Sequence, residues 1–261
     1  MMDVRYLKVI FAGLLINGSA NAGVINFSEN FNAPTTGINY VGSASQTSFG
    51  GGSAQLTPNA YGQSGAIWNS TAVEFTSFST SFDFIIGPSA GNGADGFTFS
   101  AIDAGTYDSS TAIGGAGGGL GYLGLGNSFA VEFDTWNNGS VDGFNANHVG
   151  INQDGSIDSL ARQNLPFSLE TTDASNWHTA DIAMDDNGLL TVEIDNNLFL
   201  SQTLTGFSNN VYFGFTSATG GARDGHYIDN WDLTASVPEP GTLALMGLGL
   251  AGLGFSRKFK K

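Results

Sequence analysis

Five side chains that can bind a metal ion lie between Ala130 and Ile151, in a stretch that reads AVEFDTWNNGSVDGFNANHVGI. They are two carboxylates two residues apart, an amide, a third carboxylate and an imidazole, namely Glu132, Asp134, Asn138, Asp142 and His148. Oxygen donors suit Ca²⁺, and an imidazole among carboxylates suits Mn²⁺ or another transition ion. The stretch therefore predicts a site for divalent cations.

Two β-prone runs must position these groups. On a strand, Glu132 and Asp134 project from the same face because they are two residues apart. His148 opens a second run at 148–151, and the polar, glycine-containing loop between the runs carries the amide and the third carboxylate. A solvated acidic strand edge is the alternative. It does not explain two carboxylates among apolar neighbours, where unpaired burial is costly.

The segment resembles the metal-binding core of the legume-type (L-type) lectins, whose pattern is close to E-x-D-T-aromatic-x-N followed by D and H-x-G-I. The resemblance implies two ions side by side. For the transition ion the implied ligands are the side chains of Glu132, Asp134, Asp142 and His148. For Ca²⁺ they are Asp134, the backbone carbonyl of Trp136, Asn138 and Asp142. Gly143 stands where proline is common in the family.

The same resemblance implies a sugar site built from three further segments. Asp95, in the sequence GADGFTF, would accept hydrogen bonds from sugar hydroxyls after a cis Ala94–Asp95 peptide. An ordinary turn aspartate is the alternative there. Gly118, in a glycine string at 117–124, would donate its backbone N–H, and its register within the string is open. In the loop at 216–223, Gly221 and Ala222 would add contacts.

Two residues of the cation loop are also expected at the sugar. The Asn138 side chain would bind Ca²⁺ through its oxygen and the sugar through its amide nitrogen. Trp136, or another aromatic nearby, would stack on the apolar face of the sugar, and packing in the core is the alternative for Trp136. His178 and His226 lie outside any such cluster, each with an aspartate nearby in sequence (Asp181, Asp224), and are expected to be structural.

The rest of the body alternates short β-prone runs with Gly, Asn, Asp and Ser. The runs lie at 24–31, 72–86, 96–102, 128–136, 177–184, 189–194, 211–216 and 227–233. In the second run Phe78, Phe82 and Phe84 share one strand face, and Phe75 is out of phase, which predicts a bulge or break. Asp186-Asn187-Gly188 predicts a hairpin turn. The pattern predicts an all-β antiparallel sandwich, and the resemblance implies its concanavalin-like jelly-roll form.

The two ends indicate processing rather than folding. Residues 1–22 carry Arg5 and Lys8, an apolar run and a final Ala-Asn-Ala, which is typical of a signal peptide. An uncleaved anchor is the alternative, although the run is short for a membrane span. Residues 237–261 contain Pro-Glu-Pro, an apolar glycine-rich run and a basic end. This order resembles the PEP-CTERM sorting tail of Gram-negative bacteria, which an exosortase processes; a plain tail anchor is the alternative.

These features predict a signal peptide at 1–22, a lectin-like sandwich at 23–236 and a sorting segment at 237–261. The protein would be exported and membrane-associated through its C-terminal segment until the tail is processed. It would then act at the cell surface or outside the cell.

Composition excludes several function classes. The 261 residues are enough for one sizeable core, and the absence of cysteine excludes disulfides and thiolate metal sites. Six of the 8 Lys+Arg residues and two of the 23 acidic residues lie in the terminal segments, so the body keeps two basic and 21 acidic residues, a charge near −19. Without a basic patch, nucleic acid is not an expected partner.

The sequence therefore predicts a Ca²⁺-dependent carbohydrate-binding protein without catalysis, whose partner is a glycan or exopolysaccharide. A glycoside hydrolase is one alternative, since some share the sandwich and use paired carboxylates. The hydrolase pattern E-x-D-x-x-E would require an acidic residue where the chain has Asn137. A matrix protein in which cations only stabilise the fold is the other alternative.

Overall fold

The β-prone runs form two antiparallel sheets in the computed structural model, which describes residues 23–87 and 93–238. The expected signal peptide and the tail from residue 239 onward lie outside the described residues. Helical turns in the described ranges are the short 3₁₀ segments η1 (Phe49–Gly51) and η2 (Gly117–Gly119). No helix among these residues is long and apolar enough to cross a membrane.

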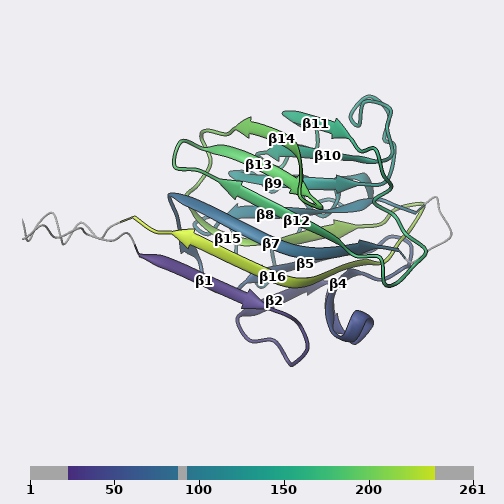
Figure 1. The fold of residues 1–261 in the computed structure, drawn as a ribbon, viewed down its shortest axis with the longest axis horizontal. Coiled ribbons are helices and arrows are strands. Elements are labelled where there is room, and N and C mark those ends of the chain that lie inside the picture. Colours follow the sequence, from purple (N-terminus) through teal and green to yellow (C-terminus); the bar gives the residue numbers. More distant parts are fainter. Residues whose placement is uncertain (1–22, 88–92, 239–261) are drawn as a thin grey trace, which may run out of the picture. The chain divides into compact units, whose positions relative to one another are not determined.

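One sheet, called here the back sheet, has the strand order β14-β13-β12-β7-β16-β4-β3, with β1 paired to β16 (Figure 1). Its strands are β14 (Asn197–Thr203), β13 (Leu189–Ile194), β12 (His178–Met184), β7 (Ser77–Ile86), β16 (His226–Ser236), β4 (Ser53–Thr57), β3 (Ser45–Thr47) and β1 (Val24–Glu29). Strands β12 and β13 form the hairpin predicted at 186–188, where the Asp185 N–H donates to the Leu189 carbonyl at 3.1 Å.

The other sheet, the front sheet, has the order β11-β10-β9-β8-β15-β5-β2, with β6 paired to β15. Its strands are β11 (Ala161–Asn164), β10 (His148–Gln153), β9 (Ser128–Asp134), β8 (Gly96–Asp103), β15 (Asn210–Ala218), β5 (Ser64–Asn69), β2 (Ile38–Gly42) and β6 (Val73–Glu74). The two sheets confirm the predicted antiparallel sandwich. Strand β9 ends two residues earlier than predicted, because the Trp136 N–H turns back to the Asp134 side chain.

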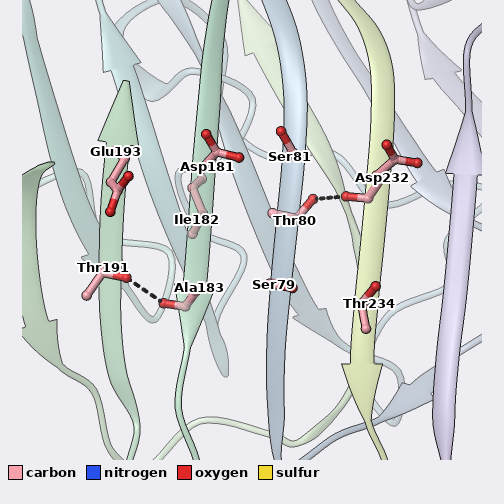
Figure 2. A pocket seen from close by; sticks show the side chains of 10 residues that line it. All are labelled: Ser79, Thr80, Ser81, Asp181, Ile182, Ala183, Thr191, Glu193, Asp232 and Thr234. Atoms are coloured by element: carbon pink, nitrogen blue, oxygen red, sulfur yellow. Dashed lines mark hydrogen bonds between the residues drawn. The ribbon is translucent and has the colours of Figure 1, made fainter. Parts of the chain in front are cut away.

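Phenylalanines fill the space between the sheets. Alternation along β7 directs Phe78, Phe82 and Phe84 into the core, as predicted. Ser79 and Ser81 line a polar depression on the outer face of the back sheet (Figure 2). Within the front sheet Phe97 and Phe133 stack with ring centroids 4.6 Å apart, and Phe84 of the back sheet packs against Phe133 with centroids 5.0 Å apart. Each buried phenylalanine contributes about 2–3 kcal/mol of hydrophobic stabilisation.

The break predicted around Phe75 separates β6 from β7, and Phe75 itself is buried. Trp231 on β16 is fully buried, and its indole N–H donates to the Thr80 hydroxyl at 3.1 Å. Tyr227 on the same strand is only half-buried and accepts a hydrogen bond from Gln55.

A loop layer covers the outer face of the front sheet. Trp68 and Ala130 on the sheet pack there against Tyr122 and Leu125 of the loop at 104–127. This cover buries polar side chains that would otherwise face solvent, among them Thr98 and the site carboxylates described below. The loop layer therefore creates a buried polar zone outside the main core.

Candidate cation and carbohydrate site

Strand register brings the predicted metal ligands together at one end of the front sheet. Asp134 on β9 lies opposite His148 on β10 and opposite Gly96 on β8. Glu132 lies opposite Gly150, where a Cβ atom would come 2.2 Å from the Glu132 Oε1 atom. A glycine at that position leaves the space that the carboxylate occupies.

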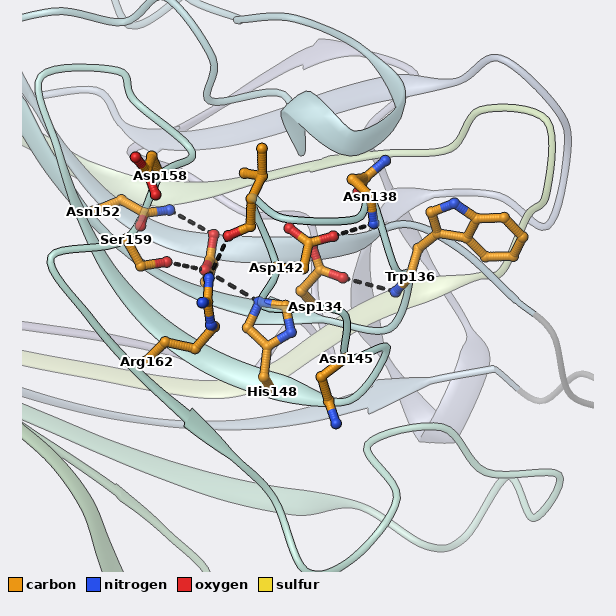
Figure 3. Close-up of polar contacts among 12 residues, drawn as sticks. Asp134, Trp136, Asn138, Asp142, Asn145, His148, Asn152, Asp158, Ser159 and Arg162 are labelled. Atoms are coloured by element: carbon orange, nitrogen blue, oxygen red, sulfur yellow. Dashed lines mark hydrogen bonds and ion pairs between the residues drawn. The ribbon is translucent and has the colours of Figure 1, made fainter.

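Three of the predicted ligands, Asp134, Asp142 and His148, converge (Figure 3), and Glu132 lies against the imidazole. One ligand atom each from Asp134, Asp142 and His148 lies within 4.8 Å of the others, and all three residues are buried. The Glu132 Oε1 atom is 3.3 Å from the His148 Nε2 atom. Three carboxylates and an imidazole therefore surround one volume.

The loop between β9 and β10 is closed by its own polar groups. The Trp136 N–H donates to the Asp134 Oδ1 atom at 2.7 Å, and the Asn138 N–H donates to the Asp142 Oδ2 atom. Gly143 has a φ of 59°, which a proline, restricted to φ near −65°, cannot adopt. Arg162 explains the close packing there, because its guanidinium donates to the Val141 carbonyl and a Cβ atom on Gly143 would approach it to 2.6 Å.

Two neutral side chains that were not predicted from the sequence hold Glu132 in place. The Asn152 amide donates to the Glu132 Oε2 atom at 2.6 Å, and the Ser159 hydroxyl donates to the Oε1 atom at 2.5 Å. Asn152 was detectable, since it shares a strand face with His148 at a spacing of four residues. Ser159 comes from a loop and has no periodic signal.

The electrostatics of this cluster require a positive partner. Glu132 and Asp134 are 2% exposed, and Asp142 is 4% exposed. Burial, reinforced by the charge of Glu132, raises the pKa of Asp134 well above its ordinary value. Burial also raises the pKa of Asp142, while the Asn138 N–H opposes that shift. Buried carboxylates resist ionisation in this way until a cation compensates them.

The donor set fits divalent ions. Among the described residues, neither ring nitrogen of the fully buried His148 makes a hydrogen bond, and the Nε2 atom has only the ion-pair contact with Glu132 at 3.3 Å. Buried polar atoms are rarely left in that state. A metal ion would use both the imidazole lone pair and the surrounding carboxylate oxygens, which are ligands that Mn²⁺ and Ca²⁺ accept.

Asp95 lies beside this cluster on the loop that leads into β8. The Ala94–Asp95 peptide is cis, as the resemblance implied. The Asp95 N–H donates to the Ala218 carbonyl at 3.0 Å, and the Asp95 carbonyl accepts from the Thr135 N–H at 2.9 Å. Burial, and then the charge of Asp142, raises the pKa of Asp95 to about 6. Within the described ranges its Oδ2 atom has no hydrogen-bond partner.

Glycines allow two other loops to approach Asp95 and Asn138. A Cβ atom on Gly118 would lie 2.6 Å from the Asn138 Nδ2 atom. A Cβ atom on Gly220 would lie 3.2 Å from the Asp95 Oδ2 atom. The structure thus places Gly118 against Asn138, while its neighbour Gly117 and Gly220 lie close to the Asp95 carboxylate.

The other predicted sugar contacts are exposed or partly exposed. Gly221 has open space around it, and the Ala222 carbonyl accepts a hydrogen bond from the Gly220 N–H at 3.2 Å. The glycine of this loop that packs against Asp95 is Gly220. Trp136 is 37% exposed, so it lies at the rim rather than in the core.

A pair of carboxyl groups that the sequence analysis did not find supports the Asp95 loop. The Gly93 N–H donates to the Glu170 Oε1 atom at 2.9 Å, and a Cβ atom on Gly93 would lie 1.8 Å from the Asp224 Oδ2 atom. Burial, and then a hydrogen bond that protonated Glu170 donates to Asp224, raises the pKa of Glu170 to about 7. The two carboxyl groups therefore share a proton around neutral pH. They lie against Gly93, which is two residues before Asp95.

The two remaining histidines have structural partners. The His178 Nδ1 atom lies 2.7 Å from the Asp195 carboxylate, not from the nearby Asp181. The His226 Nδ1 atom lies 2.6 Å from the Thr57 hydroxyl, and complete burial lowers the pKa of His226 to about 3. Neither ring reaches the cation cluster's ligand set.

Comparison with known proteins settles the family. Residues 25–231 match the model of the legume lectin β-barrel domain. The chain belongs to the legume lectin family. Residues 236–258 match the PEP-CTERM protein-sorting motif, which supports export of this lectin-family protein.

Plant lectins are similar to it in sequence and in structure. The anti-H(O) lectin of Lotus tetragonolobus is 32% identical over 189 residues, which cover 67% of this chain and 75% of that protein. Lectin 9 of Medicago truncatula is 30% identical over 196 residues, 66% of this chain and 67% of that protein. Lectins are carbohydrate-binding proteins without catalytic activity, which confirms the expectation that this chain is not an enzyme.

Solved structures agree on the fold. Winged bean acidic lectin complexed with methyl-α-D-galactose superposes with a TM-score of 0.71 at 24% identity, covering 83% of this chain and 100% of that one. Lectin I-B4 from Griffonia simplicifolia, in its metal-free form, gives a TM-score of 0.67 at 26% identity, covering 80% and 99%.

Proposed function

We propose that the chain is an exported, Ca²⁺-dependent carbohydrate-binding protein of a Gram-negative bacterium. The observation that carries this proposal is the meeting of Asp95, Asn138 and Gly118 beside a buried carboxylate cluster. Asp95 offers a buried acceptor oxygen, and the other two offer an amide and a backbone N–H. This combination suits the vicinal hydroxyls of a neutral sugar.

Two ions would hold the site in shape. The proposed ligands of the transition ion, Mn²⁺ or a similar ion, are Glu132, Asp134, Asp142 and His148. Those of Ca²⁺ are Asp134, the Trp136 carbonyl, Asn138 and Asp142. When bound, the ions supply positive charge to the cluster and fix the loop that carries Asn138. The chain's own Asn152 and Ser159 already orient Glu132 for this role.

Sugar recognition then rests on this chain's polar groups. Asp95 accepts hydrogen bonds from hydroxyls, while the Asn138 amide and the Gly118 N–H donate. Trp136, exposed at the rim, stacks on the apolar face of the ring. Gly221 and Ala222 supply outer contacts.

Export and sorting complete the proposal. The signal peptide is cut after Ala22, and an exosortase-type enzyme processes the segment from residue 237. Until then the tail keeps the protein at the membrane. The mature protein acts at the cell surface or in an extracellular polysaccharide matrix.

Calorimetry with the best-bound neutral glycan from an array tests the site. Asp95→Ala removes a charge-assisted acceptor worth about 1.5–3 kcal/mol, so affinity should fall roughly tenfold to a hundredfold. Metal content should stay unchanged. Asp186→Ala, at an exposed hairpin carboxylate, is the matched control and should bind normally.

Three results would redirect the proposal. Unchanged affinity in Asp95→Ala would place the sugar elsewhere. Release of reducing ends from a glycan would favour a hydrolase. Absence of glycan binding by a fully metal-loaded protein would favour the structural matrix role.

A further inference from the structure

Two loops meet beside the proposed sugar site and present an aromatic ring together with an arginine. The loop at 58–63 connects β4 to β5, and the loop at 219–225 connects β15 to β16. The Arg223 guanidinium carbon lies 4.3 Å above the centre of the Tyr61 ring. Tyr61 is 60% exposed, so the pair faces solvent.

Hydrogen bonds between the two loops, centred on the buried Thr219, hold this pair in place. The Thr219 N–H donates to the Gln63 carbonyl at 2.9 Å, and the Gln63 N–H donates to the Thr219 hydroxyl at 2.9 Å. That hydroxyl also donates to the Ala60 carbonyl at 2.6 Å, and Thr219 is fully buried. The position of Tyr61 is therefore fixed by the fold and is not that of a loose surface side chain.

A further hydrogen bond between the same loops places the pair next to Asp95. The Gly62 N–H donates to the Gly220 carbonyl at 3.3 Å. Gly220 in turn packs against the Asp95 carboxylate, since a Cβ atom on Gly220 would lie 3.2 Å from the Oδ2 atom. Gly62 follows Tyr61 directly, so a second sugar linked to one bound at Asp95 has a direct path onto the Tyr61 ring.

The charge of Arg223 is distinctive in this chain. The body from residue 23 to 236 holds only two basic residues against 21 acidic ones. Arg162 is engaged with the Val141 carbonyl in the cation loop. Arg223, by contrast, makes no hydrogen bond or ion pair within the part of the chain that the structure describes. A stacked guanidinium keeps its planar donor edge available, and that edge matches a carboxylate in a bidentate manner.

We propose that Tyr61 and Arg223 form a second subsite, which takes a carboxylated sugar residue next to the neutral sugar held by Asp95. The Tyr61 ring packs against the C–H face of the uronic acid, and Arg223 binds its carboxylate. The ligand class is thus a uronate-containing glycan rather than a fully neutral one. This inference rests on the proposed function, because it extends that site by one residue.

The test uses an array of uronate-containing oligosaccharides beside the same oligosaccharides with their carboxyl groups reduced to hydroxyls. The wild type should prefer the acidic member of a pair roughly fivefold, the scale of one exposed ion pair, and added salt should reduce the preference. Arg223→Gln should bind both members equally, at the level of the reduced one. Tyr61→Ala should weaken binding to both members, because both lose the ring.

The outcomes separate this inference from the function on which it rests. Equal binding of both members by the wild type overturns the second subsite and leaves the primary site intact. An unchanged acidic preference in Arg223→Gln overturns the role of that residue. A sulfated analogue bound as well as the uronate would replace carboxylate recognition by general anion binding. Binding of neither member by the wild type, or normal binding by Asp95→Ala, overturns the primary site as well.

Discussion

A single methyl group at position 118 tests whether Asn138 and Gly118 work together. A Cβ atom there would lie 2.6 Å from the Asn138 Nδ2 atom and 2.7 Å from its Oδ1 atom, whereas ordinary contacts begin at 3.4 Å. In Gly118→Ala the amide must therefore retreat by about 0.8 Å, the difference between 3.4 and 2.6 Å. Ca²⁺–oxygen distances vary only from about 2.3 to 2.6 Å, so this shift breaks the proposed coordination.

The fold should tolerate the same change. Gly118 is not among the glycines with positive φ, so alanine brings no backbone strain. Asn138 is exposed and its side chain can rotate into solvent. We expect less than about 1 kcal/mol of lost stability, together with at least a tenfold loss of sugar affinity.

Calorimetry, metal analysis and thermal denaturation check this prediction together. Gly126→Ala is the matched control, because its Cβ atom would meet only the Tyr107 hydroxyl oxygen, at 4.0 Å, and its φ is also ordinary. The control should bind sugar with at most a small change. Wild-type affinity and full Ca²⁺ content in Gly118→Ala would refute the assignment of Asn138.

Three further predictions concern the ions, a proton and the tail. Asp134→Ala and Asp142→Ala should each lose both ions, since each carboxylate is shared, and unchanged metal stoichiometry would contradict this. Chelation should lower the melting temperature, because ions bind only the native state; at a hundredfold excess over Kd the effect is about 2.7 kcal/mol per ion. The pKa of Glu170 is raised from 4.5 to about 7 in the native protein, so its protonated form adds stability that is complete below pH 4.5 and is lost as the pH rises through about 7. For this half-exposed group we expect about 1 kcal/mol after solvent screening. Glu170→Gln, whose amide oxygen still accepts from the Gly93 N–H, should remove the decline in denaturant titrations, and an identical decline would refute the shared proton with Asp224. Mass spectrometry of protein from the native host should show no peptide from residues 257–261, whereas an intact tail in most molecules would indicate a simple anchor.

The sequence by itself determined the features that depend on local spacing. Glu132 and Asp134 share a face because a strand repeats every two residues, and the same rule places Phe78, Phe82 and Phe84 in the core. The turn at 186–188 follows from residues that favour tight hairpins. These features need no knowledge of distant contacts.

Strands with weak local signals escaped prediction. The segments that form β2, β4 and β5 are short and rich in Gly, Ser, Asn and Gln, and β11 and β14 lie at sheet edges. Their hydrogen bonds come from neighbouring strands, so their β conformation is a property of the sheets rather than of their own sequence.

The tertiary structure alone decided which groups meet. His178 pairs with Asp195 instead of Asp181, because residues 178 and 181 point to opposite faces of β12. Gly220 packs on Asp95, and this approach of two loops depends on contacts between residues more than a hundred positions apart.

The supporting groups of the site were equally out of reach of the sequence. Ser159 orients Glu132, and Glu170 shares a proton with Asp224, from loops that have no periodic pattern. Such pairs form only after the sheets have fixed the ends of each loop. The candidate metal ligands could be proposed from residue spacing and the family resemblance, whereas the groups that support them require the folded arrangement of several loops.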